Sequence, residues 1–198
     1  EQLEDPKSVK GLVKRGVVEI ATPALTFCEQ SRQGNRNNFL AAIHYTNSVI
    51  GSAFLDLSTG DFFVSEGSLQ DVDKIIRSFA PNEIIVQKKY LRNLEASNFN
   101  IKSVKTYEDW VFTKDFAYET LNSQFDTLSL KGFGVEKMEN SVIAAGAIMN
   151  YLKETMHNEL NHICSIKKID NSNYMWLDGF TIKNLELIYA HNGTSLFD

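Results

Sequence analysis

Three apolar segments separated by short turn signals constrain the fold of this chain most strongly. Residues 39–45, 48–57 and 62–64 are largely apolar, and the residues between them are Thr46-Asn47 and Ser58-Thr59-Gly60. Asn, Ser and Gly favour turns, and apolar runs of strand length joined by tight turns are typical of hairpins. The sequence therefore predicts a three-stranded antiparallel meander.

The segments that follow predict a mixed α/β sheet. Ser68 is a helix N-cap candidate, and apolar residues at helical spacing continue from it to Pro81. Further elements are expected over 82–87 (strand), 90–97 (short helix), 100–107 (edge strand), 108–125 (near-helical) and 140–156 (strong helix opening on Asn140 or Ser141). Because parallel βα units follow an antiparallel meander, we expect a mixed sheet with flanking helices.

Composition excludes several classes of protein. The chain has 198 residues, 43% of them hydrophobic and 23% charged, which fits one domain with or without appendages. No apolar run approaches the length of a membrane span, so we expect no membrane partner. The net charge of −5 excludes a globally basic nucleic-acid binder. Two cysteines and no signal peptide favour the cytoplasm.

The two ends of the chain predict that it is an excised fragment. Residues 17–20 read as a strand with no partner nearby, and the polar residues 27–37 read as a linker at a domain boundary. Near the other end, a possible strand at 173–177 precedes a helix at 180–190 that has no obvious packing partner. Functions that reside elsewhere in a longer protein would leave no trace here.

The carboxylates Asp56 and Asp61 flank the second turn and allow two interpretations. Nucleases of ribonuclease H-like fold hold Mg²⁺ with an Asp on a meander strand, so the pair could belong to a divalent-metal nuclease. Such a site needs further carboxylates, and no spacing rule brings Glu83, Glu108 or Asp109 to it. The favoured interpretation is a hairpin turn in which Gly60 takes the left-handed position and Asp61 caps it.

Other candidate chemistry is incomplete. His157, Glu159, His162 and Cys164 are zinc ligands by type, but histidines five residues apart do not share a helix face, so no metal site is predicted. No Walker A loop or nucleophile elbow occurs, and a flavodoxin-like module would need a Gly-rich phosphate loop. A basic set could contact DNA phosphates, and it comprises Lys7, Lys10, Lys14 and Arg15.

Seven segments in order resemble the MutS family of DNA mismatch-repair proteins. They are "EQLEDP", "VKRGVVEIATPAL", "NFLAAI", "SAFLDLSTGDF", "LKGFGVE", "AAGAIMNYLKETMHNELNHI" and "MWLDGFTIKNLEL", and together they extend over essentially the whole chain. The resemblance implies that 1–35 end a mismatch-recognition domain and its linker. It further implies that 36–165 form a connector domain of ribonuclease H-like fold without nuclease chemistry, and that 166–198 begin the helical core, or lever, domain.

The resemblance also implies a role. The connector would be non-catalytic and would offer a surface to MutL during ATP-dependent repair, while ATP, Mg²⁺, mismatched double-stranded DNA and homodimer formation would belong to the whole parent protein. The family's mismatch-reading Phe-x-Glu motif and its ATPase are absent from the sequence.

Two kinds of candidate site follow from the connector interpretation. Hinges are expected at 27–36 and 165–172, because short linkers let a rigid domain move as a body. A partner surface is expected on the polar face of helix 140–156 and its extension, where polar residues recur at three- and four-residue spacing. These residues are Asn150, Lys153, Glu154 and His157.

Overall fold

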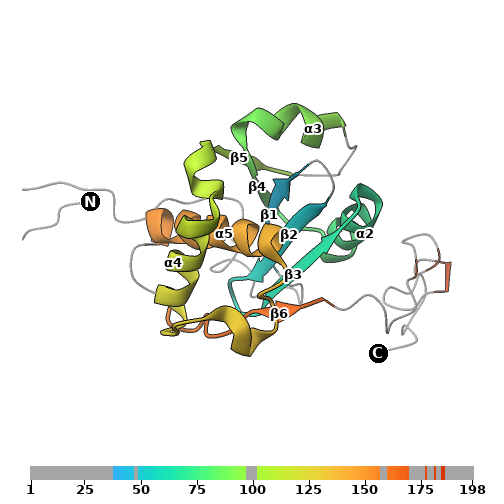
Figure 1. Cartoon of the computed structure of the whole chain (residues 1–198). Helices are drawn as coiled ribbons and strands as arrows, with labels where there is room; N and C mark the ends of the chain where they lie inside the picture. The colour runs from blue at the N-terminus through green and yellow to red at the C-terminus, as the bar shows by residue number, and fades with distance from the viewer. Residues whose placement is uncertain are drawn as a thin grey trace, which may run out of the picture.

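A computed structural model shows a six-stranded mixed sheet with helices against both of its faces (Figure 1). The structure describes residues 38–46, 49–96, 102–156 and 160–169, together with Leu177, Thr181, Asn184 and Leu185. The elements predicted at 17–20 and 27–37, and nearly all of those at 173–177 and 180–190, lie outside this part of the chain. The strands are β1 (Phe39–Tyr45), β2 (Ile50–Asp56), β3 (Phe62–Gly67), β4 (Glu83–Gln87), β5 (Val104–Tyr107) and β6 (Lys167–Lys168).

The first three strands confirm the predicted meander. β1 pairs antiparallel with β2, with Phe39 opposite Asp56, and β2 pairs antiparallel with β3, with Ile50 opposite Gly67. β4 then lies parallel to β1, and β5 lies parallel to β4 at the edge of the sheet, as expected of βα units. The sheet order is β5-β4-β1-β2-β3-β6. The mixed α/β class is therefore confirmed, whereas the two-residue strand β6 has no counterpart in the prediction.

The helices begin and end close to the predicted residues. They are α2 (Leu69–Phe79), η2 (Lys88–Tyr90), α3 (Leu91–Ala96), η3 (Asp109–Phe112), α4 (Lys114–Gln124), η4 (Leu130–Phe133) and α5 (Glu139–Met156). Ser68 caps α2 in a capping box: its hydroxyl accepts from the Asp71 amide, and the Asp71 carboxylate accepts from the Ser68 amide. The segment 108–125 is divided, because the chain passes from a 3₁₀ turn into α4 at Thr113.

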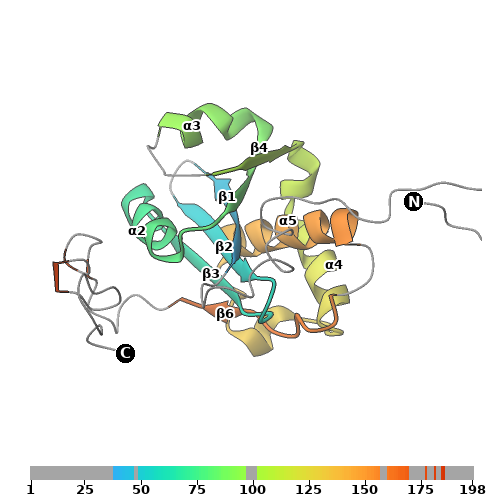
Figure 2. The same cartoon turned by 180° about the vertical axis from the view of Figure 1, so that it is seen from behind.

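Alternating side chains divide the core into two halves on opposite faces of the sheet. Leu40, Ala42 and Leu55 pack with α4 and α5, whereas Ala41 and Ile43 pack with α2 and α3. All seven residues of β1 are buried because this strand is covered on both faces. The result is a three-layer arrangement, which Figures 1 and 2 show from opposite sides. Among the described residues, no helix is both long enough and apolar enough to cross a membrane.

Helix α5 crosses β2 at unusually close range, and Gly51 allows it. A Cβ atom on Gly51 would lie 2.1 Å from the backbone carbon of Asn140, in the first turn of the helix. Beside this contact, the Glu66 side chain on β3 accepts a hydrogen bond of 3.1 Å from the Ser141 amide. A carboxylate is favourable here because the first amides of a helix have no partner within the helix and carry partial positive charge. Two strands therefore seat the helix N-terminus.

Replacing Gly51 by alanine is expected to destabilise the protein by about 1–3 kcal/mol, because the added methyl group meets backbone that a rotamer change cannot move. The measurement is the midpoint of thermal unfolding, which should fall by several degrees. Gly132→Ala is the matched control, since a Cβ there meets nothing within 4 Å. Equal midpoints for the two variants would contradict the role given to Gly51.

Candidate hinge and partner surface

The turn between β2 and β3 is closed by its own backbone and by Asp56. The Gly60 amide donates to the Asp56 carbonyl at 2.9 Å, and the Asp56 amide donates to the Asp61 carbonyl at 3.0 Å. Gly60 has φ of +77°, a left-handed conformation that glycine adopts without strain. The Asp56 carboxylate accepts from the Ser58 amide at 2.9 Å and from the Ser58 hydroxyl at 2.6 Å. The sequence Ser-Thr-Gly is therefore a hairpin turn, as predicted.

The two aspartates of this turn have different surroundings and different partners. Asp56 is fully buried, whereas the Asp61 side chain is 44% exposed and forms an ion pair with Lys167. No group of three or more His, Cys, Asp or Glu in the described residues could hold a metal ion. The acids considered as further ligands are engaged elsewhere: Glu83 accepts from Tyr151, Glu108 pairs with Lys88, and Asp109 pairs with Lys89. Nothing in this geometry favours the nuclease alternative.

The segment 160–169 lies against the same turn as the chain leaves the sheet. The His162 Nε2–H donates to the Leu57 carbonyl at 2.9 Å. A Cβ on Gly60 would lie 2.6 Å from the His162 carbonyl oxygen, so glycine also allows this close approach. From α4, the Gln124 amide donates to the carbonyls of Leu160 and Ile163 at 2.8 and 3.2 Å. The turn thus holds residues 160–169 in place, and we call these residues the exit segment.

The end of the exit segment joins the sheet as β6. Lys167 and Lys168 pair with Phe63 and Val64, and the Ile169 amide donates to the Val64 carbonyl at 2.8 Å. The Lys167 ammonium lies 2.8 Å from the Asp61 carboxylate and 5.8 Å from the centre of the Phe63 ring. Residues 166–169 of the hinge predicted over 165–172 are therefore held against the sheet, a contact that the sequence did not indicate.

The zinc interpretation gains no support. His157 and Glu159 lie outside the described residues. The His162 ring is used by the Leu57 carbonyl, and the exposed thiol of Cys164 lies 3.1 Å from the Asn161 carbonyl.

The predicted partner surface is described in part. On α5, Lys153 and Glu154 are exposed and Asn150 is half-buried, while His157 lies outside the described residues. The Asn150 amide and the Tyr107 hydroxyl both donate to the Glu154 carboxylate, at 2.9 and 2.5 Å. Burial, and next this hydrogen bond, raise the pKa of Tyr107 well above its usual range. The basic set Lys7, Lys10, Lys14 and Arg15 lies outside the described residues.

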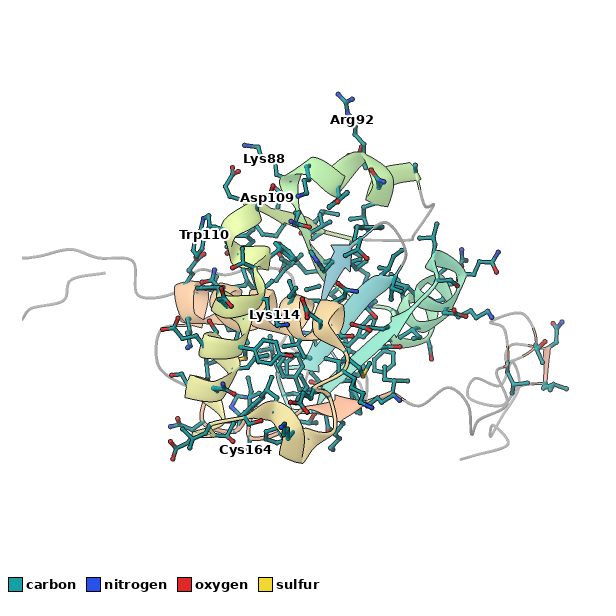
Figure 3. The ribbon with its side chains drawn as sticks, viewed as in Figure 1. Lys88, Arg92, Asp109, Trp110, Lys114 and Cys164 are labelled. Carbon is teal, nitrogen blue, oxygen red and sulfur yellow. The ribbon has the colours of Figure 1, made fainter. Side chains whose placement is uncertain are left out.

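A second polar network, which the sequence did not reveal, lies at the carboxyl ends of β1 and β4. His44 Nδ1 lies 3.1 Å from the Gln87 side-chain carbonyl, and the Gln87 amide donates to Asp109 at 3.1 Å. Burial lowers the pKa of His44, and its ring stacks on Phe112. Figure 3 shows Lys88 and Asp109 at this end of the molecule, beside Trp110, whose side chain is 56% exposed. Only the pairing of parallel strands brings these distant positions together.

Comparison with known proteins gives a consistent result. A family model described as MutS domain II matches residues 38–164. Proteins named DNA mismatch repair protein MutS from Christiangramia forsetii, Bacteroides fragilis and Cytophaga hutchinsonii are 44%, 46% and 45% identical over 100%, 99% and 96% of this chain. The chain spans only 22–23% of the length of these relatives.

One solved structure is also similar, although too distantly to support an argument. It is the Fowlpox virus resolvase in complex with Holliday junction DNA, with a TM-score of 0.37 and 11% identity over 58% of this chain and 98% of that one.

The ion pair on the exit segment should be visible in the titration of Asp61. The hydrogen bond from Lys167, and next that from Thr59, lower the pKa of Asp61 below its ordinary value of 3.8. The stabilisation is therefore complete above the ordinary value and is lost as the pH falls through the lowered pKa of the folded state. Lys167→Met should move the pKa of Asp61 back toward 3.8, and an NMR titration of the Asp61 carboxyl measures this. Lys131→Met, which breaks the exposed pair with Glu136, is the control. An unchanged Asp61 titration in Lys167→Met would contradict the ion pair.

Proposed function

The chain belongs to the MutS domain II family, and we propose that it joins the mismatch-recognition domain to the core of its parent protein and moves as a rigid body between them. The observation that carries this proposal is the match over residues 38–164. That range contains β1 to β5 and the helices from α2 to α5, which pack against the two faces of one central sheet. A connector of this kind performs no chemistry of its own and acts through its ends and its surface.

The contacts of the exit segment refine the expected domain boundaries. We propose that the connector extends from about residue 36 through Ile169, because Ile166 is buried in the core and β6 pairs with β3. Residues 1–35 would then end the preceding domain, and the core, or lever, domain would begin after Ile169 instead of at residue 166. Supporting this, 27–37 are mostly polar and 170–173 are entirely polar, so neither stretch carries the apolar run that a packed core requires.

The finer fold proposal is a ribonuclease H-like sheet that lacks a nuclease site. An antiparallel β1-β2-β3 meander with β4 and β5 added parallel to β1 supports it.

Several properties are proposed for the parent protein and not for this chain. These are ATP and Mg²⁺ binding, recognition of mismatched double-stranded DNA, homodimer formation and a cytoplasmic location. The relatives' name, DNA mismatch repair protein MutS, supports them. The 198 residues contain no Walker A pattern, and we assign ATP binding to the part of the parent protein outside this chain.

For MutL, we propose a docking surface on the outer face of α5 around Lys153, with Asn150, Glu154 and His157 beside it. The polar face of this helix is rigidly presented, because its other face, including Ile148 and Leu152, is fully buried. Lys153 is the most informative residue to change, since no hydrogen bond or ion pair of its side chain occurs within the described residues and it is exposed.

If this surface binds MutL, Lys153→Glu should weaken binding about tenfold or more, because a charge placed against its like in an interface costs at least that factor. The measurement is a titration of the purified chain against MutL. Lys137→Glu is the matched control, since that exposed lysine also has no ion pair among the described residues and precedes α5, roughly 20 Å away along the helix.

Two outcomes would distinguish a wrong MutL surface from a wrong connector role. Saturable binding that Lys153→Glu leaves unchanged would exclude this surface and leave the connector role intact. Cleavage of nucleic acid by the same preparation with Mg²⁺ or Mn²⁺, abolished by Asp56→Asn, would overturn the connector role in favour of the nuclease.

For DNA, we propose that Lys7, Lys10, Lys14 and Arg15 contact phosphates. In the full-length protein, replacing Lys14 and Arg15 by alanine should make the dependence of DNA affinity on salt shallower by about one unit of slope per lost contact. Fluorescence anisotropy at several salt concentrations measures this. An unchanged slope would mean that these residues lie away from the backbone.

A further inference from the structure

The exit segment is held by two sets of contacts that differ greatly in depth. Its first part is tied to the core: Ile163 and Ile166 are 1% and 2% exposed, and Gln124 and Leu57 bond to it. Its last part is held less deeply. Both residues of β6 are exposed, the side chains of Lys167 and Asp61 are 56% and 44% accessible to solvent, and Ile169 is half-buried against the core on the α2 side of the sheet.

Apart from the packing of the half-buried Ile169 side chain, the outer contacts are few and each contributes little. A two-residue strand at a sheet edge has little pairing to lose, and exposed ion pairs contribute little because water and salt screen them. Segments with few buried contacts open locally without unfolding the rest of a protein. The inner contacts meet none of these conditions, so opening should stop at Ile166.

We propose that Asp61, Phe63 and Lys167 form a releasable latch, which we call the exit latch, and that its opening detaches residues 167–169 from β3 and lengthens the outgoing linker. The ammonium of Lys167 is the moving part, and Asp61 and the ring of Phe63 form its fixed seat on the hairpin. That this linker leads to a following domain rests on the proposed function. The opening itself does not, because every contact involved lies within this chain.

The release changes the reach of the chain by a defined amount. With the latch closed, the outgoing chain starts at the β3 edge after Ile169. With the latch open, it starts after Ile166, and three more residues add up to about 10 Å of extended chain. This change in length suits a hinge that alternates between a closed and an open state, because neither the sheet nor α5 has to move.

The test is amide hydrogen exchange by NMR on the whole chain, with the Ile169 amide as the reporter because its bond to the Val64 carbonyl breaks on opening. In the wild type, the Ile169 amide should exchange faster than core amides such as those of Ala42 and Ile85. Asp61→Asn, which keeps an oxygen for the Thr59 hydroxyl, should raise the Ile169 rate about two- to fivefold, as expected when an exposed ion pair is lost.

Controls distinguish the latch from general destabilisation. Glu136→Gln removes a different exposed ion pair, the one with Lys131, and should leave the Ile169 rate unchanged. Lys167→Met should raise the rate at least as much as Asp61→Asn, because it also removes the contact with the Phe63 ring. Adding Asp61→Asn to Lys167→Met should have no further effect, since the ion pair is already lost. High salt should accelerate exchange at Ile169 in the wild type and not in Asp61→Asn.

Two results would overturn the proposal. The Ile169 amide could exchange at the rate of the core amides, which would mean that β6 opens only with the whole domain. The second such result is an Ile169 exchange rate that stays the same in both Asp61→Asn and Lys167→Met. It would mean that the ion pair does not hold the segment. Because no partner is present in this experiment, its failure would leave the proposed binding to MutL untouched, and the reverse is also true.

Discussion

The packing of α5 across β1 and β2 is the constraint on which the rest of the structure depends. From Val142 to Leu152 nearly every residue of the helix is buried, which requires close contact on more than one side. Gly51 lets the helix approach the sheet and Gly146 lets it approach α4, since a Cβ at either position would meet backbone or Cα atoms within 2.6 Å. Once α5 is seated, α4 packs along it, and Gln124 of α4 then helps to position the exit segment.

The hairpin turn shows how one short sequence can serve two structural purposes. Asp56 faces inward and orders the turn through Ser58, whereas Asp61 faces outward and receives Lys167. Gly60 is required by the left-handed turn and also by the approach of His162. Two nearby carboxylates suggested a metal site in the sequence, whereas in the structure Asp56 is buried and bonded to Ser58, and Asp61 is exposed and paired with Lys167.

The sequence predicted those features that depend on local pattern. The meander, the Ser68 cap and the end of α2 before Pro81 follow from turn chemistry and periodicity over a few residues. It missed β6 because two lysines followed by Ile169 carry no strand signal, and their pairing depends on a hairpin about 100 residues earlier. The His44, Gln87 and Asp109 network was missed for the same reason, since it exists only after β1 and β4 pair.

A gradient of stability along the chain links this fold to its role as a connector. The residues of β1, of β4 and of nearly all the middle of α5 are buried, and so are Ile163 and Ile166 in the exit segment. Beyond Ile166, the two residues of β6 are exposed and an ion pair holds them at the sheet edge beside the half-buried Ile169. A domain that transmits movement must be rigid within and compliant where it joins its neighbours, because a soft body would absorb the motion and a fixed joint would prevent it. Apolar residues fill the interior and make it rigid. The joint stays compliant because Asp61 and Lys167 are exposed, and water weakens the attraction between their charges.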